Sequence, residues 1–315
     1  MRDETGIVCR VCPAGQPTTH PDRRHEDRSA PVCARIPGPR SVIAVVLGLL
    51  AALTNGAQAL INKGLTERYP ARQLIGVLYV CNCLVLLPFA PFVPWHWTGE
   101  VWLLHAASAA LMVVTAICVW DLFAAGAASS TTTASALSPI AAVTAAAIVL
   151  PGSFAPSQVV AVVLVTGGVL WALQGAFGDM GRRGVVARVF GAAAGNGLLT
   201  IASALLAARA VGVVETYVVR TALAAIVTLA MFPPRDVPLR SAPRLLFRSV
   251  LTTTSFVFII LGVQQGSPVV VQTMVATTPL FVLAAESYRA RARPPRRALG
   301  AALLVAAGVA VVLAS

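Results

Sequence analysis

Two stretches of this sequence, GAASSTTTASALSP at residues 126–139 and GSPVVVQTMVATTP at residues 266–279, decide the fold. They align without a gap at a shift of 140 positions, and both carry glycine first, threonine eighth, alanine eleventh and proline last. Nearer the start of each half, an Asn-Gly pair at 55–56 falls on a second pair at 196–197. Self-similarity at a fixed period is the signature of an internal repeat. The sequence therefore predicts two copies of one structural unit.

The composition is that of a chain that lies in lipid. Of its 315 residues 57% are hydrophobic and only 11% are charged, and the mean hydropathy is +0.79. A soluble domain carries about 25% charged residues, so a water-soluble enzyme is excluded. A membrane helix needs about 20 apolar residues, and ten runs of that scale are present. They cover residues 41–62, 73–93, 101–123, 127–150, 157–177, 185–208, 211–232, 245–264, 267–286 and 297–314.

These runs divide into two sets of five, which predicts an all-α membrane protein with ten transmembrane helices as two inverted five-helix repeats. We expect a disordered basic tail at 1–40, the first repeat at 41–177, a linker loop at 178–184 and the second repeat at 185–315. Because five is an odd number, the second copy enters the membrane from the opposite side, as in secondary transporters. The expected location is the cell membrane, plasma or inner, which the chain crosses many times.

The tail carries a cluster of possible metal ligands. Cys9 and Cys12 form a C-x-x-C, and His20, His25 and Cys33 follow, which gives enough soft ligands for tetrahedral zinc. Their spacing matches no zinc finger closely, so chance ligands in an unfolded tail are the favoured interpretation. We expect neither a metal site nor a cofactor in this chain.

In its two repeated stretches and its two Asn-Gly pairs the sequence resembles the drug/metabolite transporter superfamily, and within it the EamA-like ten-helix permeases. Glu286 also resembles the glutamate that often closes helix nine of that family, although its repeat mate in this chain is Ala146. The resemblance implies a central cavity lined mainly by helices one to four and six to nine, with helices five and ten outside. The residues that match are Asn55-Gly56, Asn196-Gly197, Arg72, Arg220 and the stretches 124–139 and 265–279.

Polar side chains at membrane depth are costly, and they usually face a cavity or a partner helix. We predict that nine of them line the substrate path, where amides and hydroxyls would hydrogen-bond a polar or zwitterionic solute. The alternative is that they join helices to one another, as Asn, Gln, Ser and Thr also do. The nine residues are Asn55, Gln58, Asn62, Asn82, Thr131, Asn196, Thr200, Gln265 and Gln272.

Ionisable residues within the runs are few. Asp121 is the candidate for proton coupling, since a carboxylate in a membrane can bind a proton, and the alternative is that it lies solvated at the interface. Arg220 follows Glu215 by five residues. It could pair with that carboxylate, pair across helices or meet an anionic substrate.

The two repeated prolines are candidate hinges. Pro139 and Pro279 fall inside apolar runs, where each removes a backbone hydrogen bond and can kink the helix. Kinks at equivalent places in the two halves would serve as gates, or they would be fixed bends that shape the bundle.

Basic residues indicate the orientation, because Lys and Arg favour the cytoplasmic side of a membrane. They gather in the gaps after runs one, five, seven and nine, and Arg248 is counted among these gap arginines. This distribution predicts cytoplasmic loops at 178–184, 233–244 and 288–296.

These features favour a transporter that moves a small polar metabolite or drug by alternating access and draws on a gradient. The expected partners are a small-molecule substrate, the lipid bilayer and, as an option, a second copy in a homodimer. We expect no enzyme activity and no nucleic-acid binding, since the net charge of +12 lies mostly in loop and tail arginines. The alternatives are a membrane-embedded enzyme acting on a lipid-linked substrate and a cation carrier of the same fold.

Overall fold

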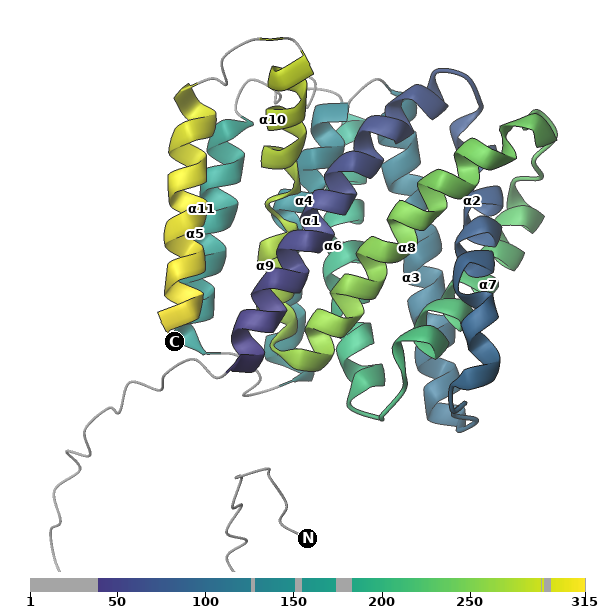
Figure 1. The fold of residues 1–315 in the computed structure, drawn as a ribbon, viewed down its shortest axis with the longest axis horizontal. Helices are drawn as coiled ribbons and strands as arrows, with labels where there is room; N and C mark the ends of the chain where they lie inside the picture. The colour runs from purple at the N-terminus through teal and green to yellow at the C-terminus, as the bar shows by residue number, and fades with distance from the viewer. Residues whose placement is uncertain are drawn as a thin grey trace, which may run out of the picture. The chain divides into compact units, whose positions relative to one another are not determined.

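The computed structural model describes residues 39–125, 128–150, 155–173, 183–289, 291 and 296–314. The predicted tail up to residue 38, with its cysteines and histidines, and residues 178–182 of the predicted linker lie outside this part. Every element in the described part is a helix (Figure 1). The α-helices are α1 (Pro39–Thr66), α2 (Ala71–Leu86), α3 (Gly99–Ala124), α4 (Ala128–Val149), α5 (Pro156–Ala172), α6 (Arg183–Ala207), α7 (Val213–Met231), α8 (Ala242–Gln265), α9 (Pro268–Val275), α10 (Thr278–Arg289) and α11 (Arg296–Ala314), with the 3-10 helices η1 (Leu87–Phe92) and η3 (Leu239–Ser241).

Length and composition suit these helices to a bilayer. Large apolar side chains point outward, and Phe92, Ile148 and Leu303 are each more than 70% exposed. Seven segments of the described part are long and apolar enough to cross a membrane, and three apolar helices are shorter. The seven are Val42–Thr66, Ala71–Phe92, Gly99–Ala124, Gly184–Ala207, Val213–Met231, Ala242–Gln265 and Pro268–Arg289, and the three are Ala134–Val149, Pro156–Ala172 and Leu299–Ala314.

Helices of the two halves pack on one another in pairs that the repeat relates. In chain order α1 to α5 correspond to α6, α7, α8, the pair α9 and α10, and α11. α1 packs on α8, and their counterparts α6 and α3 also pack together. α4 packs on α6, as α9 and α10 pack on α1. α2 packs on its own counterpart α7, and α5 on α11, which stands beside it in Figure 1.

The seam between α5 and α11 is built on two repeated glycines. A Cβ atom added at Gly168 would lie 3.2 Å from the carbonyl oxygen of Ala301. A Cβ added at Gly308 would lie at the same distance from the carbonyl oxygen of Ala161. Each glycine is thus the shift-140 mate of the other, and so is each alanine. Small residues let helix backbones approach closely where lipid supplies no hydrophobic drive.

The Asn-Gly pairs have a packing role as well. A Cβ at Gly197 in α6 would lie only 2.7 Å from the carbonyl oxygen of Ser138 in α4. A Cβ at Gly56 in α1 would lie 3.8 Å from the carbonyl oxygen of Thr278 in α10. Ser138 and Thr278 are themselves repeat mates, so each half's Asn-Gly helix packs on the other half's proline helix.

The two prolines give different backbones in the two halves. α4 continues through Pro139, whereas the ninth predicted run is not one helix, since α9 ends at Val275 and α10 begins at Thr278. A proline donates no N–H to the carbonyl four residues earlier. In both halves the preceding hydroxyl takes that place. Ser138 Oγ donates to the Ser135 carbonyl at 2.7 Å, and Thr278 Oγ1 to the Val275 carbonyl at 2.6 Å.

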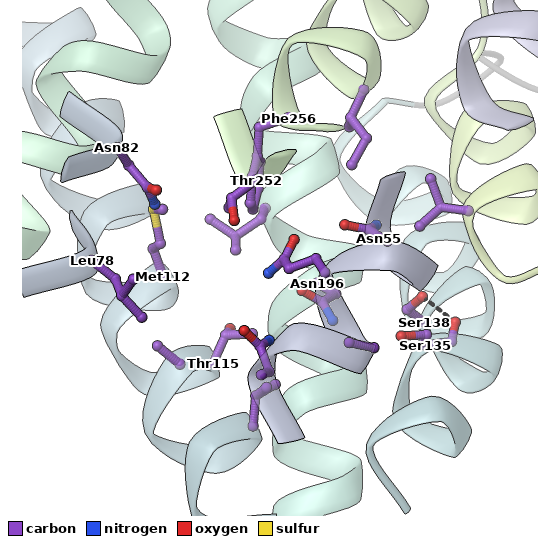
Figure 2. Close-up of a pocket in the computed structure, with 18 of the residues that line it drawn as sticks. Asn55, Leu78, Asn82, Met112, Thr115, Ser135, Ser138, Asn196, Thr252 and Phe256 are labelled. Atoms are coloured by element: carbon purple, nitrogen blue, oxygen red, sulfur yellow. Dashed lines mark hydrogen bonds between the residues drawn. The ribbon is translucent and has the colours of Figure 1, made fainter. Parts of the chain in front are cut away.

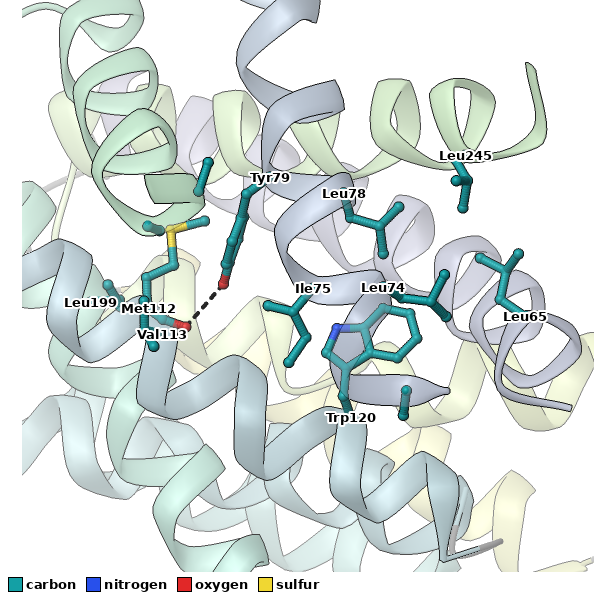
Figure 3. Close-up of a cluster of buried hydrophobic side chains, with 13 residues drawn as sticks. Leu65, Leu74, Ile75, Leu78, Tyr79, Met112, Val113, Trp120, Leu199 and Leu245 are labelled. Atoms are coloured by element: carbon teal, nitrogen blue, oxygen red, sulfur yellow. Dashed lines mark hydrogen bonds between the residues drawn. The ribbon is translucent and has the colours of Figure 1, made fainter. Parts of the chain in front are cut away.

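A hydrophobic cluster joins the halves beside the polar interior. Its buried side chains come from α1, α2, α3, α6, α7 and α8, and Leu65, Leu74 and Trp120 are among them (Figure 3). Tyr79 reaches into the same cluster and donates its hydroxyl to the Met112 carbonyl at 2.9 Å. That bond satisfies the polar end of a buried tyrosine. The cluster therefore ties six helices of the bundle together, with the tyrosine hydroxyl hydrogen-bonded inside it.

Candidate functional site

A cavity of about 180 Å³ lies between the two halves (Figure 2). Every helix from α1 to α4 and from α6 to α10 contributes to its wall, whereas no lining residue comes from α5 or α11. Asn55 of α1 and Asn196 of α6, the asparagines of the two repeated Asn-Gly pairs, both line it (Figure 2). The repeat thus places one asparagine from each half at the same cavity.

Seven of the nine residues predicted for the substrate path line this cavity. The side chain of Thr131 lies outside the described part of the chain. Gln265 ends α8, is exposed and is not part of the cavity wall. The seven lining residues are Asn55, Gln58, Asn62, Asn82, Asn196, Thr200 and Gln272.

Some of these amides join helices as well as line the cavity. Gln272 Nε2 donates to Ser138 Oγ at 2.6 Å, and Thr200 Oγ1 donates to Gln272 Oε1 at 2.7 Å. Gln272 in α9 thereby bridges α4 and α6. Asn55 Oδ1 accepts from Ser255 Oγ at 2.8 Å, which links α1 to α8. Lining and helix joining, the two alternatives for these residues, are therefore combined in the same side chains.

Other amides keep hydrogen-bonding capacity for a ligand. The side chain of Asn196 has no hydrogen-bond partner among the described residues. Asn82 is 1% exposed, and its Oδ1 is buried without a partner in the same part of the chain. Gln58 Oε1 is in the same condition. A buried polar group without a partner costs about 1–3 kcal/mol, so these atoms favour a polar occupant.

Arg248 is the main residue that the sequence interpretation misplaced. It does not lie in a loop but in the second turn of α8, where it is 5% exposed and lines the cavity. Its Nε donates to Asn62 Oδ1 at 2.9 Å, and its guanidinium carbon lies 5.5 Å from the centre of the Trp120 ring. Arg248, Thr252 and Ser255 stand at helical spacing in the sequence. This polar stripe indicates that Arg248 shares one face of the helix with the two hydroxyls.

Arg220 lines the cavity from α7 and is 1% exposed. Its Nε donates to Ser108 Oγ and its Nη2 to Ser203 Oγ, both at 3.1 Å. It does not pair with Glu215. Within the described residues no carboxylate lies within 4.0 Å of Arg220 or Arg248.

Comparison with known proteins identifies the class. The EamA-like transporter family matches residues 42–174 and again residues 184–314. The chain belongs to the EamA-like transporter family. It is therefore a multi-pass membrane protein of a transporter family, as the resemblance of its motifs predicted. A crystal structure described only as that of a protein is 18% identical, with a TM-score of 0.69 over 87% of this chain and 97% of that chain, which shows a shared fold. No curated protein matches.

The EamA-like chain holds Asp121 in ion pairs at one end of the bundle and outside the cavity wall. Arg72 donates two hydrogen bonds to the Asp121 carboxylate, from Nε at 3.0 Å and from Nη2 at 2.9 Å. Arg188 Nε lies 3.3 Å from Asp121 Oδ2. The coupling role of Asp121 stays a prediction.

At the other end of this transporter, Glu215 is buried beside two histidines. Its carboxylate accepts from the backbone N–H of His96 at 2.9 Å and lies 2.8 Å from His96 Nδ1. His105 Nε2 is 3.9 Å away. In the loop after α6, hydrogen bonding to Glu100 raises the pKa of Arg209. The acids at both ends thus have basic partners. Arg220 and Arg248 in the cavity, in contrast, have no acidic partner among the described residues.

Proposed function

We propose that this EamA-like transporter carries a small polar solute across the cell membrane by alternating access, driven by a gradient, through a bundle of ten spans. At a rise of about 1.5 Å per residue, the 22, 17 and 19 residues of α4, α5 and α11 extend about 33, 26 and 28 Å. The hydrocarbon core is about 30 Å thick. The three shorter apolar helices therefore suit a bilayer with little mismatch, and they bring the seven candidate spans to ten.

The two halves would have opposite orientations in the membrane. Arg72 at the start of α2 and Arg188 near the start of α6 both pair with Asp121. α6 thus begins at the edge of the bundle where α1 ends, so the two corresponding helices run in opposite directions. Opposed repeats with a site between them are the framework of alternating access in secondary transporters.

The observation that carries the proposal is the cavity between the two halves, with one repeated asparagine from each. Asn55 and Asn196 occupy equivalent places in the repeat and line the same space. When the halves exchange conformations, a solute held between them meets the opposite side of the membrane. The other lining amides and hydroxyls would hydrogen-bond the same solute.

The test is transport by purified protein in proteoliposomes, after a metabolite and drug screen in cells with and without the gene has supplied a solute. Asn55→Ala and Asn196→Ala should each lower flux about three- to tenfold, the range for one lost hydrogen bond. Thr144→Ala is the control, because Thr144 is exposed on α4 and its hydroxyl bonds only the Ile140 carbonyl. Unchanged flux in both asparagine variants would remove them from the solute path.

A further inference from the structure

Among the described residues that line the cavity there are two cations, Arg220 and Arg248, and no carboxylate. A guanidinium has five N–H donors. Arg248 uses only Nε, on Asn62, and Arg220 uses Nε and one N–H of Nη2, on two serines. The remaining donors of both groups, including all four Nη hydrogens of Arg248, have no hydrogen-bond partner among the described residues.

Burying a charge in a membrane protein is costly unless it is paired. The groups that contact the two guanidiniums are hydroxyls, one amide oxygen and the face of Trp120. These groups offset part of the desolvation cost but carry no negative charge. The acids that the sequence offers as partners are used elsewhere, since Asp121 pairs with Arg72 and Glu215 with His96. The described residues therefore leave the two guanidiniums without a counter-charge, which an anionic ligand can supply.

We propose that the cavity binds a small organic anion, and that Arg220 and Arg248 of its wall supply the positive charge that attracts its carboxylate. This inference rests on the proposed transport function and names the substrate class of that site. The planar fork of arginine suits a carboxylate, which can accept two parallel N–H bonds. Two fixed cations also repel a cationic solute from the same space, which opposes the cation-carrier alternative.

The rest of the wall limits the body of this anion. Trp120, Phe123 and Phe256 line the cavity together with Met112. Such side chains accept an apolar group, while Asn82 Oδ1 remains available for a hydroxyl or amino substituent. The cavity volume of about 180 Å³ is below the 300–1,000 Å³ typical of pockets that bind drug-sized ligands. The cavity thus fits a short carboxylic acid with an apolar portion better than a large drug.

Binding by the unaltered protein is the first test. The probes are matched pairs that differ in charge, namely 3-phenylpropanoate against 3-phenylpropanamide and lactate against lactamide, with glycerol 3-phosphate against glycerol as the phosphate arm. Titrations follow tryptophan fluorescence and thermal stability in detergent, since a ligand that binds only the folded state raises Tm. We expect the carboxylate of at least one pair to bind at least tenfold more tightly than its amide. Equal binding within every pair overturns the proposal, and preference for the phosphate alone assigns the site to phosphate esters instead.

Variants then locate the anion. Arg248→Gln and Arg220→Gln should each weaken binding of the preferred anion about ten- to a hundredfold, the range for a lost charged hydrogen bond. Arg244→Gln is the matched control, because Arg244 lies one turn earlier in α8 and is exposed. Arg248→Lys keeps the charge without the fork and should fall between Arg248→Gln and the unaltered chain. Equal affinity in Arg248→Gln and Arg244→Gln overturns the assignment of Arg248.

Two readouts separate this inference from the transport proposal. Anion binding that depends on the arginines, without any flux in proteoliposomes, would refute the transport function and leave the anion site standing. Flux of a neutral or cationic solute that no anion inhibits would refute the anion site and leave transport standing. Size-exclusion profiles identify variants that fail to fold, and the isostere pairs need no variant at all.

Discussion

Alanine at Gly168 should loosen the seam between α5 and α11, whereas alanine at the neighbouring Gly167 should strengthen the same helix. A Cβ at Gly168 would lie 2.9 Å from Leu304 Cβ and 3.2 Å from the Ala301 carbonyl oxygen. A Cβ at Gly167 would meet no atom within 4 Å. Both sites are in the interior of α5, so the pair differs mainly in this close approach.

The magnitude follows from two opposing terms. Glycine in a helix interior costs about 0.5–1 kcal/mol relative to alanine, so Gly167→Ala should raise the free energy of unfolding by that amount. Gly168→Ala gains the same term, but its methyl group overpacks the seam at a cost of about 1–3 kcal/mol. Because the helix term cancels, the two variants should differ by about 1–3 kcal/mol, with Gly168→Ala the less stable.

Reversible unfolding in mixed detergent micelles, followed by far-ultraviolet circular dichroism, measures this difference. Gly308→Ala is the second arm, since a Cβ there would lie 2.7 Å from Val165 Cγ2 and 3.2 Å from the Ala161 carbonyl oxygen. It should lose stability as Gly168→Ala does. A difference between Gly167→Ala and Gly168→Ala below about 0.5 kcal/mol, the usual error of such comparisons, would refute the close-packed seam.

Two further predictions concern the proline step and the paired acid. Thr278→Val keeps the shape but removes the hydroxyl that satisfies the Val275 carbonyl, so the free energy of unfolding in micelles should fall by about 1–3 kcal/mol. Thr144→Val is the control and should change stability little, because the exposed Thr144 hydroxyl bonds a carbonyl in a continuous helix. Equal losses in the two variants would contradict the role of the proline. Asp121→Asn breaks ion pairs with side chains that are 52% and 40% exposed and should cost at most about 1 kcal/mol. Flux under an imposed pH gradient should persist in Asp121→Asn, and loss of the response to the gradient would instead support the coupling role.

The family and the helical architecture could be predicted because they depend on periodic features. Apolar runs of span length and a shift that superposes Pro139 on Pro279 are visible in any single sequence. Most of the polar lining was visible for a related reason. Asn55, Gln58 and Asn62 stand at helical spacing in an otherwise apolar run, and all three line the cavity.

Helix boundaries and side-chain partners were less accessible. Arg248 was counted with the loop arginines although the eighth predicted run, 245–264, already contains it, and α8 begins at Ala242, six residues before it. Pro279 was a candidate kink and the break between α9 and α10 lies directly before it, but Pro139 was given the same role and α4 continues through it. The sequence of one half therefore could not show how the other half treats the same residue. Which acid pairs with which basic residue depends on tertiary packing. Glu215 and Arg220, for example, are five residues apart in the sequence but do not pair.

In the terms used for subunit assembly, the seam between α5 and α11 is isologous, since one surface patch meets its own equivalent as across a dimer's two-fold axis. In a true dimer of five-helix chains, each charge lining a shared cavity would occur twice. This rule does not apply to a single chain, because its two halves can differ in sequence. Here Arg220 and Arg248 both come from the second half, while the lining from the first half is uncharged. Joining the halves in one polypeptide thus permits a polar site without two-fold symmetry, which can hold an unsymmetrical solute in one orientation.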